Sequence, residues 1–386
     1  MGSEKENIVS QVKAMRMARG MSQKELAERV GVGRQAIYDM ESGRYVPNTM
    51  VALRLAKVLA CAVEDLFRML GEEPHAQPVI LADRDIAPGT RLSVAKVNDE
   101  LVAYPQDGRW LLSEGFHAAD GLLEPSGQRI RLLHDDQRLH QRILLLGCDP
   151  SFSILNAHIS RYGKGAELLC RFASSRRALE GVRKGHAHLA ATHLHNSGPE
   201  EANVIMSKDL LGQSGALVVG FSLFEEGLMV ALGNPYRIAT VVDLTKEGVR
   251  FVNRDQGAAI RVLLDDQLAR LRVPPERIDG YDRAATSHIH AAQMVAFGLA
   301  DAALGLRAVA ATYHLDFVPM QFVRCDLVIP QHFCSLPAVQ ILMDILQSKA
   351  LRADIASLPG YETSMTGSVI DVFSGSECRG LQKDAS

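Results

Sequence analysis

The chain has 386 residues, of which 47% are hydrophobic and 23% are charged, and its formal net charge is −3. This composition excludes a wholly disordered chain, and the length predicts two or three domains rather than one core. No apolar run is long enough to span a bilayer, and the N-terminus lacks the apolar segment of a secretory signal. We therefore expect a cytoplasmic protein without a membrane partner.

The charge is distributed unevenly along the chain. Residues 1–70 carry 11 Lys and Arg against 8 Asp and Glu, a net charge of +3, whereas the remainder carries −6. A nucleic-acid contact needs a basic excess, so the first seventy residues are the place to expect one. The cysteines are scattered without a CxxC pair, which in a cytosolic protein favours free thiols over disulfides. They are Cys61, Cys148, Cys170, Cys325, Cys334 and Cys378.

The first seventy residues have the periodicity and the breaks of a small helical domain. Ile8, Val12 and Met15 fit one face of a first helix. Ser22, followed three residues later by Glu25, has the capping-box pattern that begins a second helix.

The second and third predicted helices have the spacing of a helix-turn-helix. Helices that meet at a steep angle need a small residue where they cross, a turn residue between them and apolar residues facing inward. Ala27, Gly31, Ile37 and Met40 occupy these positions. Two further apolar helical segments follow, so we expect an all-α, five-helix domain over residues 1–70.

Polar residues on the third predicted helix and around it are candidates for DNA contacts. A recognition helix reaches base edges from such positions, where arginine suits guanine and glutamine suits adenine. Side chains at the start of the second helix and in the following loop are better placed for phosphates. The candidates are Arg34, Gln35, Tyr38 and Asp39 for bases, and Gln23, Arg44 and Asn48 for phosphates.

The motif QKELAERVGVGRQAIYDMESGRYVPN, within residues 7–68, resembles the lambda-repressor/Cro-like (Xre) helix-turn-helix family. The resemblance implies binding to a double-stranded DNA operator and a pairing of Arg16 with Glu41. The alternative is a helical bundle used only for protein contacts. Such a bundle does not require Ala27 and Gly31 at this spacing together with a basic outer face.

Residues 71–141 are predicted to hold a linker and a small β-rich module. Short runs of alternating apolar and polar residues are separated by turn signals, and Asp107-Gly108 suits a hairpin turn. The module contains the chain's one tryptophan, Trp110. We favour a role as spacer or dimer contact, and ligand binding by the module stays open.

From residue 142 onward, short apolar runs alternate with helical segments. RILLLGCD followed by PSFSILNAHISR is the first such unit, and ELLCRFA followed by SSRRALEGVRKG is the second. This alternation predicts parallel sheets with helices on both faces. We therefore expect a multidomain chain in which residues 142–370 form an α/β domain and residues 371–386 a disordered tail.

Small or polar residues stand at four strand-to-helix junctions of this α/β region. Ligands in such sheets bind just beyond the carboxyl ends of strands, where helix N-termini offer free N–H groups. Helix capping explains any single junction, whereas four together indicate a shared cleft. The ligand-binding candidates are Asp149, Ser151, Ser174, Ser175, His193, Asn253, Arg254, Gln256, Gly257, Arg261, Ser287, His288 and Asp301.

Residues 142–367 resemble the PBP-like domain, a relative of type 2 periplasmic binding proteins and of the molybdate-binding group. GCDPS, SSRRAL, RFVNRDQG and GLADAALGL carry the resemblance. It implies two lobes joined by crossing strands near 228–234 and 318–328, closing around a small effector such as molybdate, tungstate or a small organic anion. Relatives often follow RFVNR with a hydroxyl-rich run, whereas this chain has Gly257-Ala258-Ala259-Ile260-Arg261. Those alanines suit an organic anion with an apolar part.

Histidine pairs and catalytic motifs bear on two other possible functions, metal binding and enzyme activity. The pairs at 186/188, 193/195 and 288/290 would chelate a transition metal if both members shared a strand face. One member facing solvent is the ordinary outcome, so we predict no metal site. GxSxG, HExxH and GxxxxGK[ST] are all missing from the sequence, so we expect no enzyme activity and no cofactor.

These observations predict a ligand-responsive transcription regulator that works as a homodimer or higher homo-oligomer. An effector bound between the lobes would re-space the DNA-binding domains of the dimer, and half-sites lie about 34 Å apart. One alternative is a constitutive DNA-binding protein whose C-terminal domain only oligomerises. A transition-metal sensor is the other. Activation or repression, the operator and the identity of the effector are left open.

Overall fold

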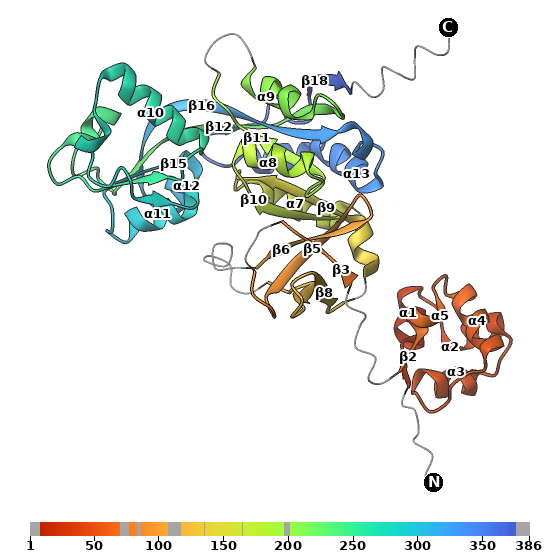
Figure 1. The fold of residues 1–386 in the computed structure, drawn as a ribbon. Helices are drawn as coiled ribbons and strands as arrows, with labels where there is room; N and C mark the ends of the chain where they lie inside the picture. Colours follow the sequence, from red (N-terminus) through yellow and green to blue (C-terminus); the bar gives the residue numbers. More distant parts are fainter. Residues whose placement is uncertain are drawn as a thin grey trace, which may run out of the picture. The chain divides into compact units, whose positions relative to one another are not determined.

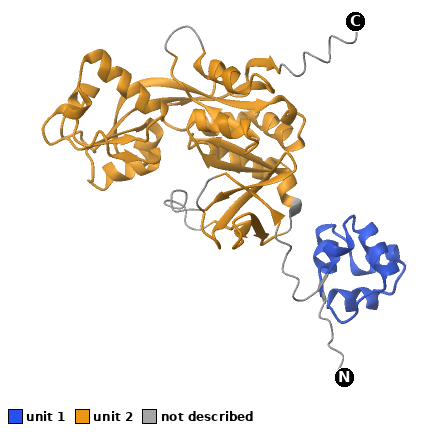
Figure 2. Ribbon diagram, viewed as in Figure 1, with its two compact units in different colours: residues 1–76 blue, residues 77–386 orange. Residues whose placement is uncertain are grey.

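The computed structural model of the chain describes residues 8–69, 77–82, 86–106, 117–134, 136–163, 165–196 and 201–375. The chain divides into two compact units, residues 1–76 and residues 77–386 (Figure 2). Asp107-Gly108, Trp110 and Cys378 lie outside the described residues, as does the tail from residue 376. What the sequence predicts for them therefore stays a prediction.

Five helices and a short two-stranded sheet form the first unit (Figure 1). The helices are α1 (Val12–Ala18), α2 (Gln23–Val30), α3 (Arg34–Glu41), α4 (Thr49–Val58) and α5 (Val63–Leu66). The predicted five-helix domain is confirmed, with one correction. Ile8 lies in β1 (Ile8–Ser10), which pairs antiparallel with β2 (Phe67–Met69), because α1 begins only after Gln11.

Capping and burial explain the helix pair at the centre of this unit. The Ser22 hydroxyl accepts a hydrogen bond of 3.1 Å from the Glu25 N–H and begins α2. Gly31 ends α2 with φ at 79°, a left-handed conformation that favours glycine. Ala27 is 3% exposed, and Ile37 and Met40 of α3 are fully buried against the same core. The predicted inward positions are therefore the observed ones.

A six-stranded sheet begins the second unit. Its strands are β3 (Gln77–Pro78), β4 (Ile80–Leu81), β5 (Arg91–Val97), β6 (Glu100–Pro105), β7 (Gly121–Leu123) and β8 (Arg129–Leu132), in the order β3-β8-β7-β5-β6-β4. One face holds its own core around Leu92 and Val94. Ala95, Val102 and Tyr104 join the core of the larger domain instead. The predicted β-rich module exists, and it is packed onto that domain.

A ten-stranded mixed sheet organises the rest of the second unit. Its strands are β9 (Arg142–Gly147), β10 (Glu167–Phe172), β11 (Leu189–Thr192), β12 (Gly215–Val230), β13 (Phe251–Arg254), β14 (Ala284–Ala285), β15 (Ala302–Leu306), β16 (Asp316–Pro330), β17 (Tyr361–Glu362) and β18 (Val369–Ser374). The main order is β10-β9-β11-β16-β12-β15-β13-β14, with β17 and β18 on β12. Strands β9–β11 and β13–β15 include the predicted parallel pairs, whereas β12 and β16 run antiparallel to their neighbours.

Two long strands join two lobes (Figure 1). Strands β12 and β16 pair from Ala216 opposite Pro330 to Val230 opposite Asp316, with register shifts between Gly220 and Ser222 and between Glu226 and Gly227. We call the part around β9, β10, β11 and β18 the first lobe, and the part around β13, β14 and β15 the second lobe. The crossing predicted at 318–328 lies in β16. The one predicted at 228–234 covers only the end of β12.

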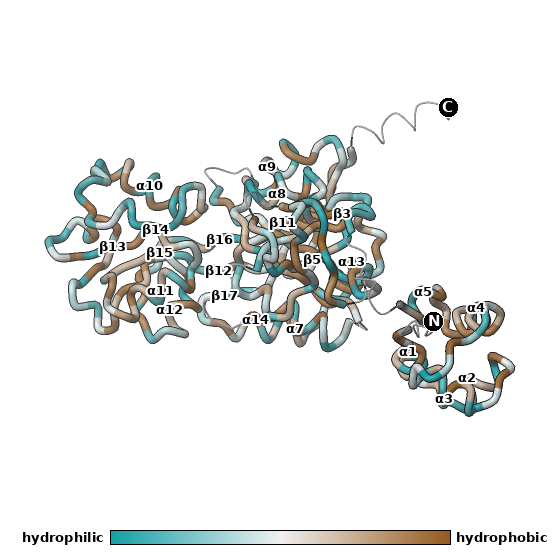
Figure 3. The backbone as a smooth tube through the Cα atoms, turned by 60° about the horizontal axis from the view of Figure 1, so that its bottom comes forward, coloured by the Kyte–Doolittle hydropathy of each residue, from teal (hydrophilic) through white to brown (hydrophobic). Residues whose placement is uncertain are grey.

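Helices cover both lobes. Those of the first lobe are α7 (Phe152–Tyr162), α8 (Ser175–Arg183), α9 (Ala202–Leu211), α13 (Pro337–Leu346) and α14 (Lys349–Ala356). Those of the second lobe are α10 (Ala259–Leu271), α11 (His288–Ala296) and α12 (Arg307–Thr312). Hydrophobic colour is concentrated around β5 and β11, where the six-stranded sheet meets the first lobe (Figure 3). Residues 371–374, predicted as tail, belong to β18 because that strand pairs with β12. Among the described residues, none of the helices combines the length and apolar character needed to cross a membrane.

One buried histidine holds the interface between the six-stranded sheet and the first lobe. His188, just before β11, is 4% exposed. Its Nδ1 accepts the Leu144 N–H at 3.0 Å, and its ring meets the edge of Phe333 at 5.0 Å between centroids. Burial lowers the pKa of His188 to about 4, against the opposing hydrogen bond with the Lys96 backbone in β5. The folded protein therefore holds His188 neutral.

We predict that His188 makes the second unit less stable as pH falls from about 6.5 to about 4. The unfolded chain protonates this histidine in that window and the folded chain does not, so the contribution is complete above pH 6.5. His188→Gln should flatten the decline in the free energy of unfolding by about 3 kcal/mol, measured by urea titration at a series of pH values. The control His140→Gln changes an exposed histidine and should leave the decline unchanged. Equal slopes for His188→Gln and the unmodified protein would contradict the prediction.

Candidate functional site

The outer face of α3 presents three polar side chains to solvent. Ile37 and Met40 are turned into the core, and Arg34, Gln35 and Tyr38 are exposed as a consequence. These are three of the four residues predicted to reach bases. The fourth, Asp39, accepts a hydrogen bond of 3.1 Å from the Gln35 side chain. This bond holds the Gln35 amide in one orientation along the helix.

The loop after α3 carries the other predicted DNA contacts. The Arg44 guanidinium lies 5.9 Å from the centroid of the Tyr38 ring, so these two exposed side chains form a cation–π pair. The Asn48 side chain accepts the Val51 N–H at 3.0 Å and caps α4. Its predicted phosphate contact stays a prediction.

A carboxylate at the end of α3 ties the first three helices together. Glu41 accepts hydrogen bonds from Arg16 Nε at 2.6 Å and Nη2 at 3.2 Å, so the pairing implied by the Xre resemblance is present. It also accepts one from Gln23 Nε2 at 2.8 Å. Burial alone would raise the pKa of Glu41, but these hydrogen bonds outweigh it and lower that pKa. Gln23 is thereby positioned beside the recognition helix.

A cleft of about 850 Å³ lies between the two lobes and extends to the six-stranded sheet. Residues that follow β9, β10, β11, β13 and β14 line it, as the positions of the polar junctions predict. The predicted residues that line the cleft are Asp149, Ser174, His193, Arg254, Gln256, Ser287 and His288. Those that do not are Ser151, Ser175, Asn253, Gly257, Arg261 and Asp301.

Four of the residues outside the lining support residues that lie in it. Ser151 donates to Asp149 at 2.7 Å, and the Ser175 hydroxyl accepts the His193 N–H at 3.1 Å. The remaining two act on Arg254. The Arg261 guanidinium donates to the Arg254 backbone carbonyl at 2.9 Å, and the side-chain oxygen Oδ1 of Asn253 accepts the Arg254 backbone N–H at 2.9 Å.

Gly257 and Asp301, which lie outside the lining of the cleft, have local structural roles. Gly257 has φ at 85° and allows the turn from β13 into α10. Asp301 receives two hydrogen bonds from the Arg250 guanidinium, at 2.9 and 3.0 Å. This ion pair lies at the start of β15, which explains why Asp301 does not reach the cleft.

The carboxylate of Asp149 accepts four hydrogen bonds from other groups of the chain. It accepts hydrogen bonds from the Ser151 N–H at 2.8 Å and the Ser151 hydroxyl at 2.7 Å. The hydroxyls of Ser222 and Tyr361 each donate to it at 2.7 Å. Ser222 sits at the register shift of β12 and Tyr361 in β17, so this carboxylate joins the first lobe to a crossing strand. Asp149 therefore has a structural role at the edge of the cleft.

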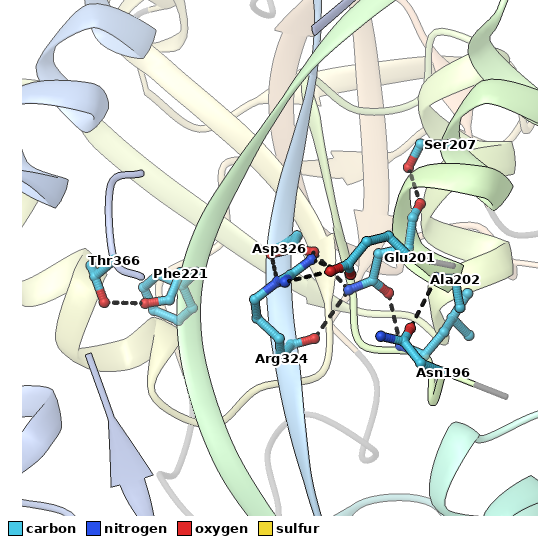
Figure 4. Close-up of polar contacts among 10 residues, drawn as sticks. Asn196, Glu201, Ala202, Ser207, Phe221, Arg324, Asp326 and Thr366 are labelled. Atoms are coloured by element: carbon cyan, nitrogen blue, oxygen red, sulfur yellow. Dashed lines mark hydrogen bonds and ion pairs between the residues drawn. The ribbon is translucent and has the colours of Figure 1, made fainter. Parts of the chain in front are cut away.

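A second polar network holds α9 against the other crossing strand (Figure 4). Asp326 accepts hydrogen bonds from Arg324 Nε and from Asn203 Nδ2, both at 2.8 Å. Arg324 also pairs with Glu201 at 2.7 Å. Across β12, the Thr366 hydroxyl donates to the Phe221 carbonyl at 2.6 Å. The first-lobe halves of both crossing strands are thus anchored on two sides.

Arg254 differs from Asp149, because its buried charge has no ion-pair partner among the described residues. It is 1% exposed and lines the cleft from the end of β13. Its Nε donates to the Ala285 carbonyl at 3.1 Å, but Nη1 is buried without a hydrogen-bond partner. Within the described part of the chain, no carboxylate forms an ion pair with it. Burial lowers the pKa of Arg254, although Cys148, Asp255 and Glu226 oppose that effect.

Two histidines flank this arginine in neutral form. His193 and His288 are 5% and 4% exposed, and burial lowers the pKa of both, that of His288 well below 6.5. The Nδ1 of His288 is buried without a partner. Cys148 Sγ lies 3.4 Å from His193 Nε2, and burial raises the pKa of Cys148 to about 12. His193, His288 and Cys148 therefore add no charge beside Arg254 at neutral pH.

Sequence reasoning missed several residues of the cleft. Cys148, Phe172, Arg177, Thr286 and His290 line it beside the junctions that were identified, so proximity to those junctions was the available signal. Nothing in the sequence placed the six-stranded sheet there, although Ser93, Tyr104 and Gln106 also line the cavity. No three His, Cys, Asp or Glu side chains gather as metal ligands in the described ranges.

Comparison with known proteins identifies both parts of the chain. A helix-turn-helix family model matches residues 12–66, and the model of the PBP superfamily domain matches residues 156–347. Protein YvgK of Bacillus subtilis is 31% identical over 228 residues, which cover 59% of this chain and 73% of that protein. An HTH-type transcriptional regulator of Archaeoglobus fulgidus is 39% identical over 64 residues, 17% of this chain and 91% of the relative. The solved structure of the sulfate-binding protein SubI from Mycobacterium tuberculosis H37Rv is 14% identical, with a TM-score of 0.43 over 55% of this chain and 83% of that one. The chain belongs to the family of proteins with a PBP superfamily domain, here joined to an N-terminal helix-turn-helix domain of the Xre type.

Proposed function

We propose that an anion bound in the cleft controls how this helix-turn-helix regulator binds its DNA operator. The observation that carries the proposal is the unpaired guanidinium of Arg254. An uncompensated charge in a protein interior costs several kcal/mol, and pairing with an opposite charge offsets that cost. An anion that accepts hydrogen bonds from the two η nitrogens supplies that pairing.

The hydrogen-bond donors that line the same cleft as Arg254 come from both lobes. Ser174 and His193 belong to the first lobe, whereas Arg254, Ser287 and His288 belong to the second. A ligand that bonds to both sets stabilises the arrangement in which the lobes are close, and β12 and β16 are the connection about which they move. The effector is then an oxyanion such as molybdate or tungstate, or a small organic anion.

Lobe closure reaches DNA through the geometry of a dimer. Two recognition helices must lie about 34 Å apart to enter successive major grooves on one side of the duplex. A change of a few ångströms in the distance between the two first units of a dimer is therefore enough to allow or prevent binding to the operator. The effector shifts this equilibrium only by the difference between its affinities for the two arrangements.

We predict that the side chain of Arg34 reads a base. Arg34→Ala should weaken binding to an operator selected from genomic fragments by about 1–3 kcal/mol, because a bidentate base contact is worth that much. Fluorescence anisotropy at fixed salt measures the change. Lys57→Ala, an exposed cation in the last turn of α4, is the matched control. Loss of affinity in the control, with none in Arg34→Ala, would show that another face of the domain meets DNA.

We predict that Arg254→Met stabilises the ligand-free protein. Removal of an unpaired buried charge should raise the free energy of unfolding by about 1–4 kcal/mol, as measured by urea denaturation. Arg270→Met, on the exposed end of α10, is the control and should change stability by less than about 0.5 kcal/mol. A loss of about 3–5 kcal/mol in Arg254→Met would instead mean that Arg254 has a protein partner.

The function itself is tested by measuring operator binding with and without an anion. Native mass spectrometry of the freshly purified chain identifies a retained ligand and the number of subunits. Molybdate, tungstate and small carboxylates are then added at millimolar concentration to the operator titration. We expect one class to change the operator Kd by about 5- to 150-fold, and Arg254→Met to abolish that change. An operator Kd that no anion alters would favour constitutive binding.

A further inference from the structure

We infer that the effector is a small organic monocarboxylate with an apolar body rather than a tetrahedral dianion. The inference rests on the proposed function, since it concerns the ligand of the same cleft. It follows from the charge of the site, the shape of the guanidinium and the character of the walls.

Arg254 is a buried cation of the cleft with which no carboxylate in the described ranges forms an ion pair. Arg254 is unpaired, whereas the nearby Glu226 is bonded to His195 at 2.6 Å and Asp149 is saturated. His193 and His288 supply hydrogen bonds but no charge, because burial keeps both neutral. One carboxylate matches the single charge of this guanidinium, whereas a dianion brings a second negative charge that Arg254 does not match.

The planar guanidinium of Arg254 matches the shape of a carboxylate. The Nε is occupied by the Ala285 carbonyl, and neither η nitrogen has a hydrogen-bond partner among the described residues. The Phe172 ring lies 5.8 Å from the guanidinium carbon and holds one face of it. Two parallel N–H groups in a plane suit the two oxygens of a planar carboxylate.

Apolar side chains from both lobes form part of the lining of the cleft. Ala258, Ala259 and Ile260 line the cleft at the start of α10, where hydroxyls would serve an oxyanion. Phe152 and Phe172 face the cleft from the first lobe. The volume of about 850 Å³ lies within the range of organic-ligand sites, about 300–1,000 Å³. The cleft therefore has room and apolar contacts for the body of an organic ligand whose charged end pairs with Arg254.

The test compares carboxylates with matched amides and with oxyanions on the full chain. The probes are sodium acetate, propionate, butyrate and benzoate, the corresponding amides, and sodium molybdate, tungstate, sulfate and phosphate. We expect the carboxylates to raise the melting temperature of the second unit and calorimetric affinity to improve about fourfold per added methylene until the cleft is filled. The amides and the oxyanions should produce no rise.

Variants locate the effect at the residues named. Arg254→Met should weaken carboxylate binding about 10- to 100-fold, whereas Arg270→Met should leave it unchanged. The double substitution Ala258→Ser with Ala259→Ser places two hydroxyls on the apolar wall and should weaken the longest bound carboxylate most. Unchanged carboxylate binding in the double variant would contradict the proposal that these alanines contact the apolar part of the ligand.

The outcomes separate the inference from the proposed function. Stabilisation by an oxyanion and not by any carboxylate overturns the inference, while the proposed function stands if that oxyanion alters operator binding. Amides that bind as well as carboxylates overturn the role of Arg254 as the anchor of a charge. If no probe stabilises the protein or changes its operator affinity, the inference and the proposed function both fail.

Discussion

The continuous pairing of β12 with β16 is the constraint on which the second unit depends. Both lobes are built outward from this ladder, so their relative position is set by two strands and their register shifts. Asp149 and Asp326 each collect hydrogen bonds that fix the first-lobe end of those strands. In the proposed function, the lobes move by bending of these strands beyond the anchors, towards the register shift between Glu226 and Gly227.

Two buried charges of the same cleft show how stability and function are divided. Asp149 accepts four hydrogen bonds from its own protein, a pattern that stabilises the fold in any state of the ligand. Arg254 is as deeply buried, yet its η nitrogens are left without partners. A site that completed this pairing itself would be more stable and would have no charge left for an anion.

Local patterns allowed much of this molecule to be predicted, and the failures share a physical cause. The spacing of Ala27, Gly31, Ile37 and Met40 depends on contacts between neighbouring helices, so the sequence reports it directly. A polar strand-to-helix junction also reports its own position, and the junctions do converge on one cleft. The same small polar residues serve as caps, supports and ligand donors, however, so Ser175 and Arg261 looked like Ser174 and Arg254. Only long-range packing distinguishes them, and it also places the six-stranded sheet beside the cleft.

In the proposed function, the two lobes offer a ligand different groups, and this difference favours a change between open and closed arrangements of the lobes. The second lobe contributes the buried charge of Arg254, whereas the donors of the first lobe include the neutral side chains of Ser174 and His193. An anion that reaches only Arg254 gains its pairing energy in an open arrangement as well as a closed one, and so shifts nothing between them. The neutral donors of the opposite lobe are gained only on closure. In the proposed function, Arg254 therefore determines whether an anion binds, and the weaker bonds to the first lobe determine how far binding changes the DNA-binding state.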